Sequence, residues 1–183
     1  MNDVLSRSQS SKDLEAYWRR LSSVFEMPDH ESFDLTDIPE LVPELFVLNL
    51  MEVPERKAHI KLSGSNLNQR AGFELTGENF LDLWHKDVRD VVWNVFRKSV
   101  ERPCGFVLLT RVRLRNASSA VMEATVVPFQ KSDRSPPSVL MSCVWTGVAL
   151  TLAMQNLIVI EIPNRFSWID LGHGVPGRSP LDF

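Results

Sequence analysis

The chain has 183 residues, of which 44% are apolar and 23% charged, so its length and composition fit one soluble domain with a single core. Its formal net charge of −3 gives no basic field for nucleic acid or anionic lipid. No apolar run approaches the ~20 residues of a membrane span and no secretory signal opens the chain, so we expect a cytoplasmic protein without membrane insertion.

The N-terminal part predicts a leader followed by a helix. Residues 1–12 are polar and rich in serine, which is typical of a mobile leader. In residues 13–27, Trp18, Leu21 and Phe25 recur at helical spacing, and Pro28 ends the pattern. A lone amphipathic helix of this length needs a surface to pack on, either on its own domain or on another chain.

Two strands and a glycine-rich stretch come next. Residues 45–53 and 58–64 predict a hairpin in which Leu48 and Ile60 point inward. The stretch after it predicts short helical turns, with Gly72 as a left-handed C-cap. Gly64, Gly72 and Gly77 are eight and five residues apart, which is too open to wrap a phosphate group, so we interpret them as structural.

Residues 84–101 predict the strongest helix, with Val92 and Phe96 on its apolar face. Three strands follow, up to about residue 149. In the first of them arginines alternate with apolar residues, so one face of that strand is basic and exposed to water. Pro128 indicates an edge or a bulge in the second strand. Residues 153–183 hold enough apolar side chains for one more strand or a docking segment.

This order of elements predicts an α+β fold with a five-stranded antiparallel sheet and helices on one face, the arrangement of PAS-type sensor folds. The chain also resembles a family of single-domain bacterial PAS-like proteins, common in alphaproteobacteria and first grouped as a family of unknown function. The family usually has Arg where Lys61 stands and Thr where Ser65 stands. The resemblance is carried by Tyr17-Trp18-Arg19, Met27-Pro28, Asp37-Ile38-Pro39, Leu41 and Pro43, Lys61-Leu62, Gly64-Ser65, Gly72-Phe73-Glu74-Leu75-Thr76-Gly77, Glu123 and Pro128-Phe129.

The resemblance implies a PAS-like domain over residues 28–152, a C-terminal extension over residues 153–183, and a sensory or signalling role. It implies no particular ligand, because the family has no shared cofactor. Haem is disfavoured because His85 is a lone histidine at the start of a helix. Flavin photochemistry is disfavoured because neither Cys104 nor Cys143 lies in the motif that the flavin-binding relatives use.

We expect no catalytic residues and no metal site, since neither a Ser–His–Asp nor a paired-carboxylate arrangement is legible. Glu123 is the best isolated carboxylate. It either faces a cavity or, as we favour, pairs with Arg111, Arg113 or Arg115 on the neighbouring strand.

The sequence therefore predicts a sensory domain that binds a small ligand or a protein partner and signals by regulated interaction, with homodimerisation as one possibility. The alternatives are a ligand-free interaction module and, more weakly, a small lyase or isomerase. We expect Trp18, Leu21 and Phe25 of the N-terminal helix to contact the partner. The residues expected to line a ligand cavity are Leu48, Ile60, Phe80, Val92, Phe96, Leu108 and Glu123.

Overall fold

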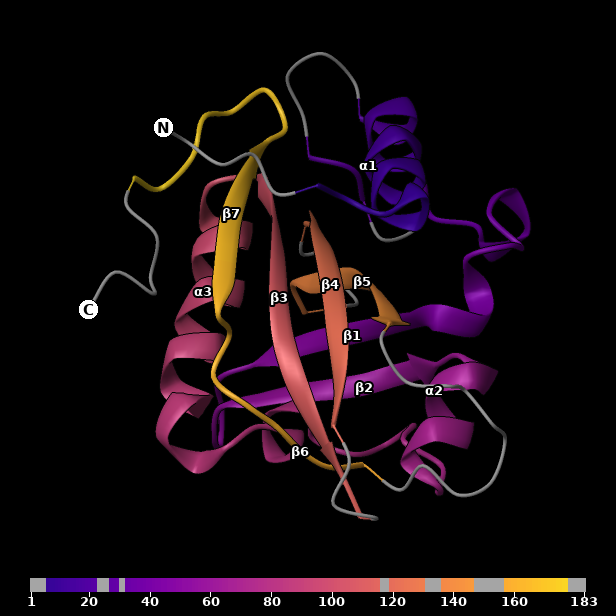
Figure 1. Cartoon of the computed structure of the whole chain (residues 1–183). Coiled ribbons are helices and arrows are strands. Elements are labelled where there is room, and N and C mark those ends of the chain that lie inside the picture. The colour runs from indigo at the N-terminus through magenta and orange to yellow at the C-terminus, as the bar shows by residue number, and fades with distance from the viewer. Residues whose placement is uncertain are drawn as a thin grey trace.

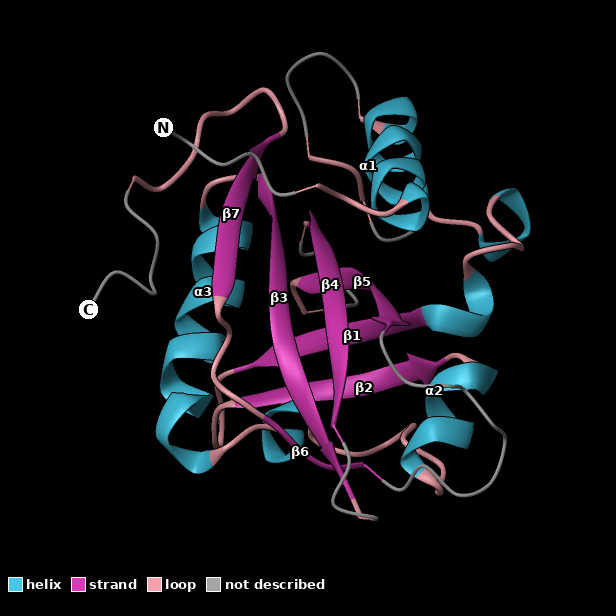
Figure 2. Cartoon of the chain, viewed as in Figure 1, coloured by secondary structure: helices cyan, strands magenta, loops and turns pink. Residues whose placement is uncertain are grey.

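The computed structural model describes residues 6–22, 27–29, 32–115, 119–130, 136–146 and 157–177. These residues form one antiparallel sheet with helices on both of its faces (Figures 1 and 2). No described helix is both long and apolar enough to cross a membrane. The elements are α1 (Gln9–Leu21), η2 (Leu35–Asp37), η3 (Val42–Glu44), β1 (Leu45–Met51), β2 (Lys57–Ser63), α2 (Ser65–Ala71), η4 (Phe80–Leu83), η5 (Lys86–Val88), α3 (Arg89–Glu101), β3 (Cys104–Leu114), β4 (Ser119–Phe129), β5 (Ser138–Thr146), β6 (Leu157–Ile160) and β7 (Arg165–Asp170), where η marks a short 3₁₀ helix.

The strand order is β2-β1-β5-β4-β3, so the hairpin β1–β2 lies beside the meander β3–β4–β5. The α+β, PAS-like fold class and the five central strands are therefore confirmed. The sheet continues beyond them, because β6 and β7 both pair with the free edge of β3. The C-terminal extension thus adds two strands to the five that the sequence predicts.

Side chains alternate along the strands and fill two cores. On β4, Met122, Ala124 and Val126 point to one face, and Val127 and Phe129 point to the other. We call the first face inner, since α2, η4 and α3 cover it, and the second outer, since α1 packs there. On β4 and β5 both faces are apolar over most of the strand, so periodicity alone does not tell the two faces apart there.

The N-terminal helix α1 starts and ends earlier than predicted. Ser8 caps it by accepting a hydrogen bond from the Ser11 N–H, so the helix begins inside the expected leader. It ends at Leu21, with Ser22 already extended. Residues 1–5 and 23–26 are not described, so the predictions for the first five residues of the leader and for Phe25 lie outside the described residues.

The helix α1 packs on its own sheet. Trp18 is fully buried, and its indole N–H donates to the Pro128 carbonyl at 2.6 Å. Contrary to the expectation, Trp18 presents no surface to a partner. Leu21 is half-buried against the same outer core.

Pro128 lies in an interior strand and not at an edge of the sheet. The pairing of β3 with β4 ends at the Phe106–Val126 pair, so Pro128 lies beyond that ladder and its missing N–H breaks no bond to β3. The prediction for Gly72 is confirmed. Gly72 is the left-handed C-cap of α2, with φ 82°, and Gly64 is the N-cap residue of the same helix.

Candidate functional site

A small cavity lies on the inner face, between α3, the sheet and the C-terminal segment that follows β5. We call residues 157–171 the C-terminal strap. The cavity volume is about 20 Å³, which is room for one or two water molecules. No nitrogen or oxygen atom of the described lining faces it. The lining residues are Trp84, Val88, Val91, Val92, Val95, Phe96, Phe106, Leu108, Ala124, Met141, Pro163 and Phe166.

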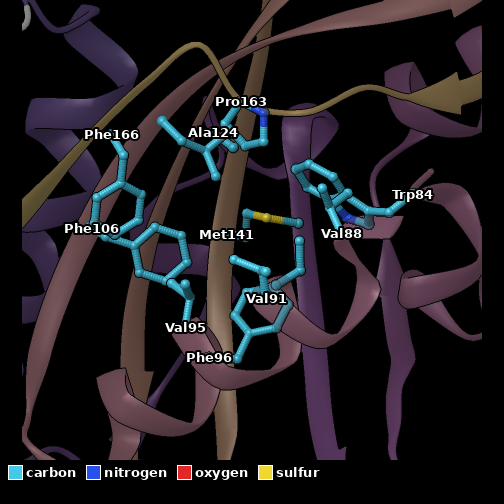
Figure 3. Close-up of a pocket in the computed structure, with 12 residues that line it drawn as sticks. Trp84, Val88, Val91, Val95, Phe96, Phe106, Ala124, Met141, Pro163 and Phe166 are labelled. Atoms are coloured by element: carbon cyan, nitrogen blue, oxygen red, sulfur yellow. The ribbon is translucent and has the colours of Figure 1, made fainter. Parts of the chain in front are cut away.

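The cavity is built mainly by α3 and by three strands of the sheet, with further walls from Trp84, Val88 and the strap. The α3 residues Val91, Val92, Val95 and Phe96 share one side of that helix because they are one, four and five positions apart. The strands β3, β4 and β5 add side chains from their inner face. In Figure 3, Phe106 and Phe166 lie at one end and Trp84 and Val88 at the other, with Met141 between them.

The strap forms one wall of the cavity through Pro163 and Phe166. Phe166 stacks on Phe106, with ring centroids 5.4 Å apart, and meets Trp168 edge-on at 4.8 Å. The aromatic contacts continue inward from Phe106 to Phe96 at 5.9 Å. These ring contacts pack the strap into the inner core. Aromatic pairs of this geometry add to the stabilisation that comes from apolar burial.

Hydrogen bonds tie the strap to its neighbours along its length. Glu161 is held twice, because its N–H donates to the Arg111 carbonyl and its own carbonyl accepts from the Thr110 hydroxyl at 2.7 Å. Beyond it the Asn164 N–H donates to a β3 carbonyl at 3.0 Å. On the helical side, the His85 N–H donates to the Ile160 carbonyl at 2.9 Å.

The described lining of the cavity holds no titratable side chain: none of its residues is Asp, Glu, His, Lys, Arg or Cys. Burial raises the pKa of Cys104 to about 12, and it raises the pKa of Cys143 as well, so both thiols are protonated and poor nucleophiles. Among the described residues, no group of three or more His, Cys, Asp or Glu side chains could hold a metal ion.

The structure brings only part of the expected lining together. Val92, Phe96 and Leu108 line the cavity. Leu48, Ile60 and Phe80 are fully buried in the same inner core but lie away from the cavity wall. Pro163 and Phe166 were not predicted to line the cavity, since nothing in a single sequence indicates that the C-terminal extension folds back over α3.

Both predictions for Glu123, that it faces a cavity or that it pairs with an arginine of the neighbouring strand, are wrong. It lies on the outer face of β4, away from the cavity, because it alternates with the inner-face residues Met122 and Ala124. Its carboxylate accepts hydrogen bonds from the Ser8 backbone N–H at 3.1 and 3.2 Å and from the Ser8 hydroxyl at 2.5 Å. None of the ion pairs found among the described residues joins it to a strand arginine, and Arg113 pairs instead with Glu161.

Comparison with known proteins gives one family and several similar folds. A family model described as PAS domain matches residues 6–143, which includes α1 but ends before the strap. No curated protein matches the chain.

The similar solved structures are distant. A LOV protein of Rhodobacter sphaeroides shares 14% identity with a TM-score of 0.44, and the match covers 64% of this chain and 71% of that one. A d2 variant of RsLOV shares 15% identity with a TM-score of 0.44, covering 79% and 72%. A Vibrio cholerae VqmA dimer, described with LuxR-type receptors, shares 10% with a TM-score of 0.42, covering 63% and 52%.

Proposed function

Because the chain belongs to the PAS domain family, we propose that it is a cytoplasmic sensory domain that acts through regulated interactions and catalyses no reaction. The observation that carries the proposal is the apolar cavity between α3 and the strap. An apolar cavity beside packed but separate elements can take up a ligand and change how those elements meet. The absence of titratable groups from its lining argues against a lyase or isomerase.

The ligand class follows from the lining. With no polar atom facing the cavity, a charged or strongly polar ligand would lose its hydration without recovering hydrogen bonds. We therefore propose a small uncharged apolar molecule. Haem and flavin do not fit this proposal: His85 is outside the lining, and the polar edges of a flavin would find no partners there.

The size of the cavity sets a condition on binding. A molecule of two or three heavy atoms, the most that about 20 Å³ can hold, gains at most roughly 1.5 kcal/mol per atom, which corresponds to a Kd in the millimolar range. A ligand of useful affinity must be larger and must move α3 and the strap apart. In this proposal, ligand binding is therefore coupled to a shift of the strap.

The same small volume favours a second candidate, a ligand-free interaction module. A void of one or two water molecules is common in a well-packed core. In that case the surface alone would carry the regulated interaction, with a second copy or a signalling protein as the partner.

A binding assay with an uncharged fluorophore separates the two candidates. N-phenyl-1-naphthylamine is titrated into the wild type and into the Ala124→Val variant, which places two extra carbons in the cavity. Ala120→Val is the matched control, because Ala120 lies on the same face of β4 in the inner core but does not line the cavity. We expect the Kd of the fluorophore to rise at least tenfold in Ala124→Val and less than twofold in the control.

A second variant guards against misfolding. Val91 is only half-buried at the rim of the cavity, so Val91→Trp should block entry without overpacking the core. Circular dichroism checks that each variant folds, and native mass spectrometry of freshly purified protein tests for a retained molecule. If the fluorophore does not bind saturably, or binds the blocked variants as well as the wild type, the ligand-binding function is wrong and the ligand-free module stands.

A further inference from the structure

Part of the outer face of the sheet has no described element over it. The helix α1 packs near one end of β4, and Figure 1 shows no described helix across the other end of β3 and β4. We call this uncovered part the open face. In its central row Arg111 of β3 lies opposite Val121 of β4, which lies opposite Thr146 of β5. Val121 is 36% exposed, an unusual value for a valine in an interior strand.

The open face is basic. Arg111 and Arg113 of β3 point outward, about 6.8 Å apart along the strand, and the exposed Arg115 directly follows the end of β3. Arg113 is paired with Glu161 at 2.8 Å, but no described acidic side chain pairs with Arg111 or Arg115. Glu123, the carboxylate at the border with α1, is engaged by Ser8. A local positive surface therefore exists in a chain whose net charge is −3.

We infer that the open face binds an acidic segment of a partner protein, with an apolar side chain of that segment covering Val121. Charge complementarity selects an acidic partner, and exposed Val121 supplies the apolar contact that a purely ionic surface lacks. This inference rests on the proposed role in regulated interaction, and it names the surface and the chemistry of the partner.

Two other occupants fit less well. A second copy docked about a twofold axis would place this basic surface against its own copy, and two surfaces of like charge repel each other. Nucleic acid is disfavoured by the overall negative charge and because the described residues of the patch include three arginines and no aromatic side chain to stack on bases.

The test uses a short fluorescein-labelled peptide in which glutamate alternates with valine, titrated at low salt by fluorescence anisotropy. Exposed ion pairs are individually weak, so removing one arginine should weaken binding a few-fold and Arg111→Gln with Arg115→Gln about tenfold. Val121→Ser should weaken it several-fold. Raising the salt should weaken binding to the wild type more than to the double variant, because fewer charges remain in the variant to be screened.

The matched control is Arg56→Gln with Arg97→Gln, which removes the same charge from exposed arginines elsewhere on the surface. We expect it to change binding less than twofold. The inference is overturned if this control weakens binding as much as the open-face variant, or if a peptide with glutamine in place of glutamate binds equally well. It is also overturned if an oligonucleotide displaces the peptide, or if sedimentation shows a dimer that Val121→Ser dissociates.

The same variants keep this inference separable from the proposed ligand site. Binding of N-phenyl-1-naphthylamine is measured beside peptide binding in each protein. Loss of peptide binding with the fluorophore still bound at wild-type affinity assigns the effect to the open face. Peptide binding that persists when the fluorophore does not bind would remove the ligand site and leave the partner surface in place.

Discussion

At the scale of single residues, Glu123 shows how one buried carboxylate can anchor a helix that is far away in sequence. It is 8% exposed, and its two oxygens accept the Ser8 N–H and hydroxyl, while the same hydroxyl caps α1. The start of the helix is therefore fixed to the middle of β4. Hydrogen bonds to a charged group are stronger than neutral ones, so this contact contributes more than an ordinary cap.

The variant Glu123→Gln tests this anchor. A glutamine offers one acceptor and one donor where two acceptors are needed, so we expect a loss of about 1–3 kcal/mol in the free energy of unfolding. Urea denaturation gives the value. Glu161→Gln, which removes one partner of an exposed ion pair, is the control and should cost less than about 1 kcal/mol. Ser8→Ala combined with Glu123→Gln should cost less than the sum of the single changes, and full additivity would refute the contact.

Trp18 yields a second prediction, which concerns both stability and association. Trp18→Phe keeps an aromatic ring but leaves the buried Pro128 carbonyl without its donor, so we expect a loss of about 1–3 kcal/mol. The mass in solution, measured by light scattering, should not change, because Trp18 is buried against its own sheet. A lower mass for the variant would show that Trp18 contributes to association with a second copy after all.

At the scale of elements, ion pairs support α1. Burial alone would raise the pKa of Glu15, but hydrogen bonds and charges from Arg7 and Arg19 hold that pKa below its ordinary value. A carboxyl whose pKa is lowered by folding contributes stability above its unfolded pKa and loses it as the pH falls through the folded value. The contribution should therefore be complete at pH 7 and fade below about pH 4.5.

We therefore predict that Glu15→Gln lowers the melting temperature at pH 7 and that the difference from the wild type shrinks as the pH falls. Melting curves from pH 7 to about pH 3 measure it. Asp13→Gln serves as the control on the same helix, since the hydrogen bond of Asp13 is exposed and does not involve an arginine. A constant difference across the pH range would show that Glu15 acts through packing and not through its charge.

The turn between β2 and α2 depends on a close approach of backbones. A Cβ at Gly64 would collide with the backbone carbonyls of Val42 and Pro43 in η3. We expect Gly64→Ala to cost at least about 2 kcal/mol, because backbone must move to admit the methyl group. Gly77 has φ +96° with open space around it, so Gly77→Ala should cost only about 1–2 kcal/mol of backbone strain. Equal costs in urea denaturation would contradict the steric explanation.

The spacing of apolar residues along the sequence predicted most helices and strands. It did not predict which distant segments pack against each other. Helical spacing located α3, alternation located β2 and β3, apolar runs between turns located the other central strands, and the open glycine spacing was correctly interpreted as structural. The face of Glu123 was not predictable, since apolar residues flank it on both faces of β4. The same holds for the cavity: Val92, Phe96 and Leu108 follow from periodicity, but Pro163 is brought to them only by tertiary folding.

At the scale of the whole molecule, the strap lies outside the family match but packs against elements inside it. The match ends at residue 143, yet β6 and β7 complete the edge of β3 and close the cavity. The strap also touches the open face, because Glu161 pairs with Arg113. If ligand binding moves the strap, it also moves Glu161 and changes the ion pair with Arg113 on the open face. The proposed ligand site and the proposed partner surface are therefore connected through this ion pair.

The variant Phe166→Ala tests whether the strap closes the cavity. It removes a ring that stacks on Phe106 and meets Trp168, and because Phe166 is only half-buried we expect a loss of about 1–3 kcal/mol, below the range for a fully buried phenylalanine. The space left behind should raise the affinity for N-phenyl-1-naphthylamine at least fivefold. Ser167→Ala, at an exposed position of the same strand, should change neither quantity. A destabilised Phe166→Ala that gains no affinity for the fluorophore would mean that the strap stabilises the fold without gating the cavity, and the coupling between ligand and strap would have to be abandoned.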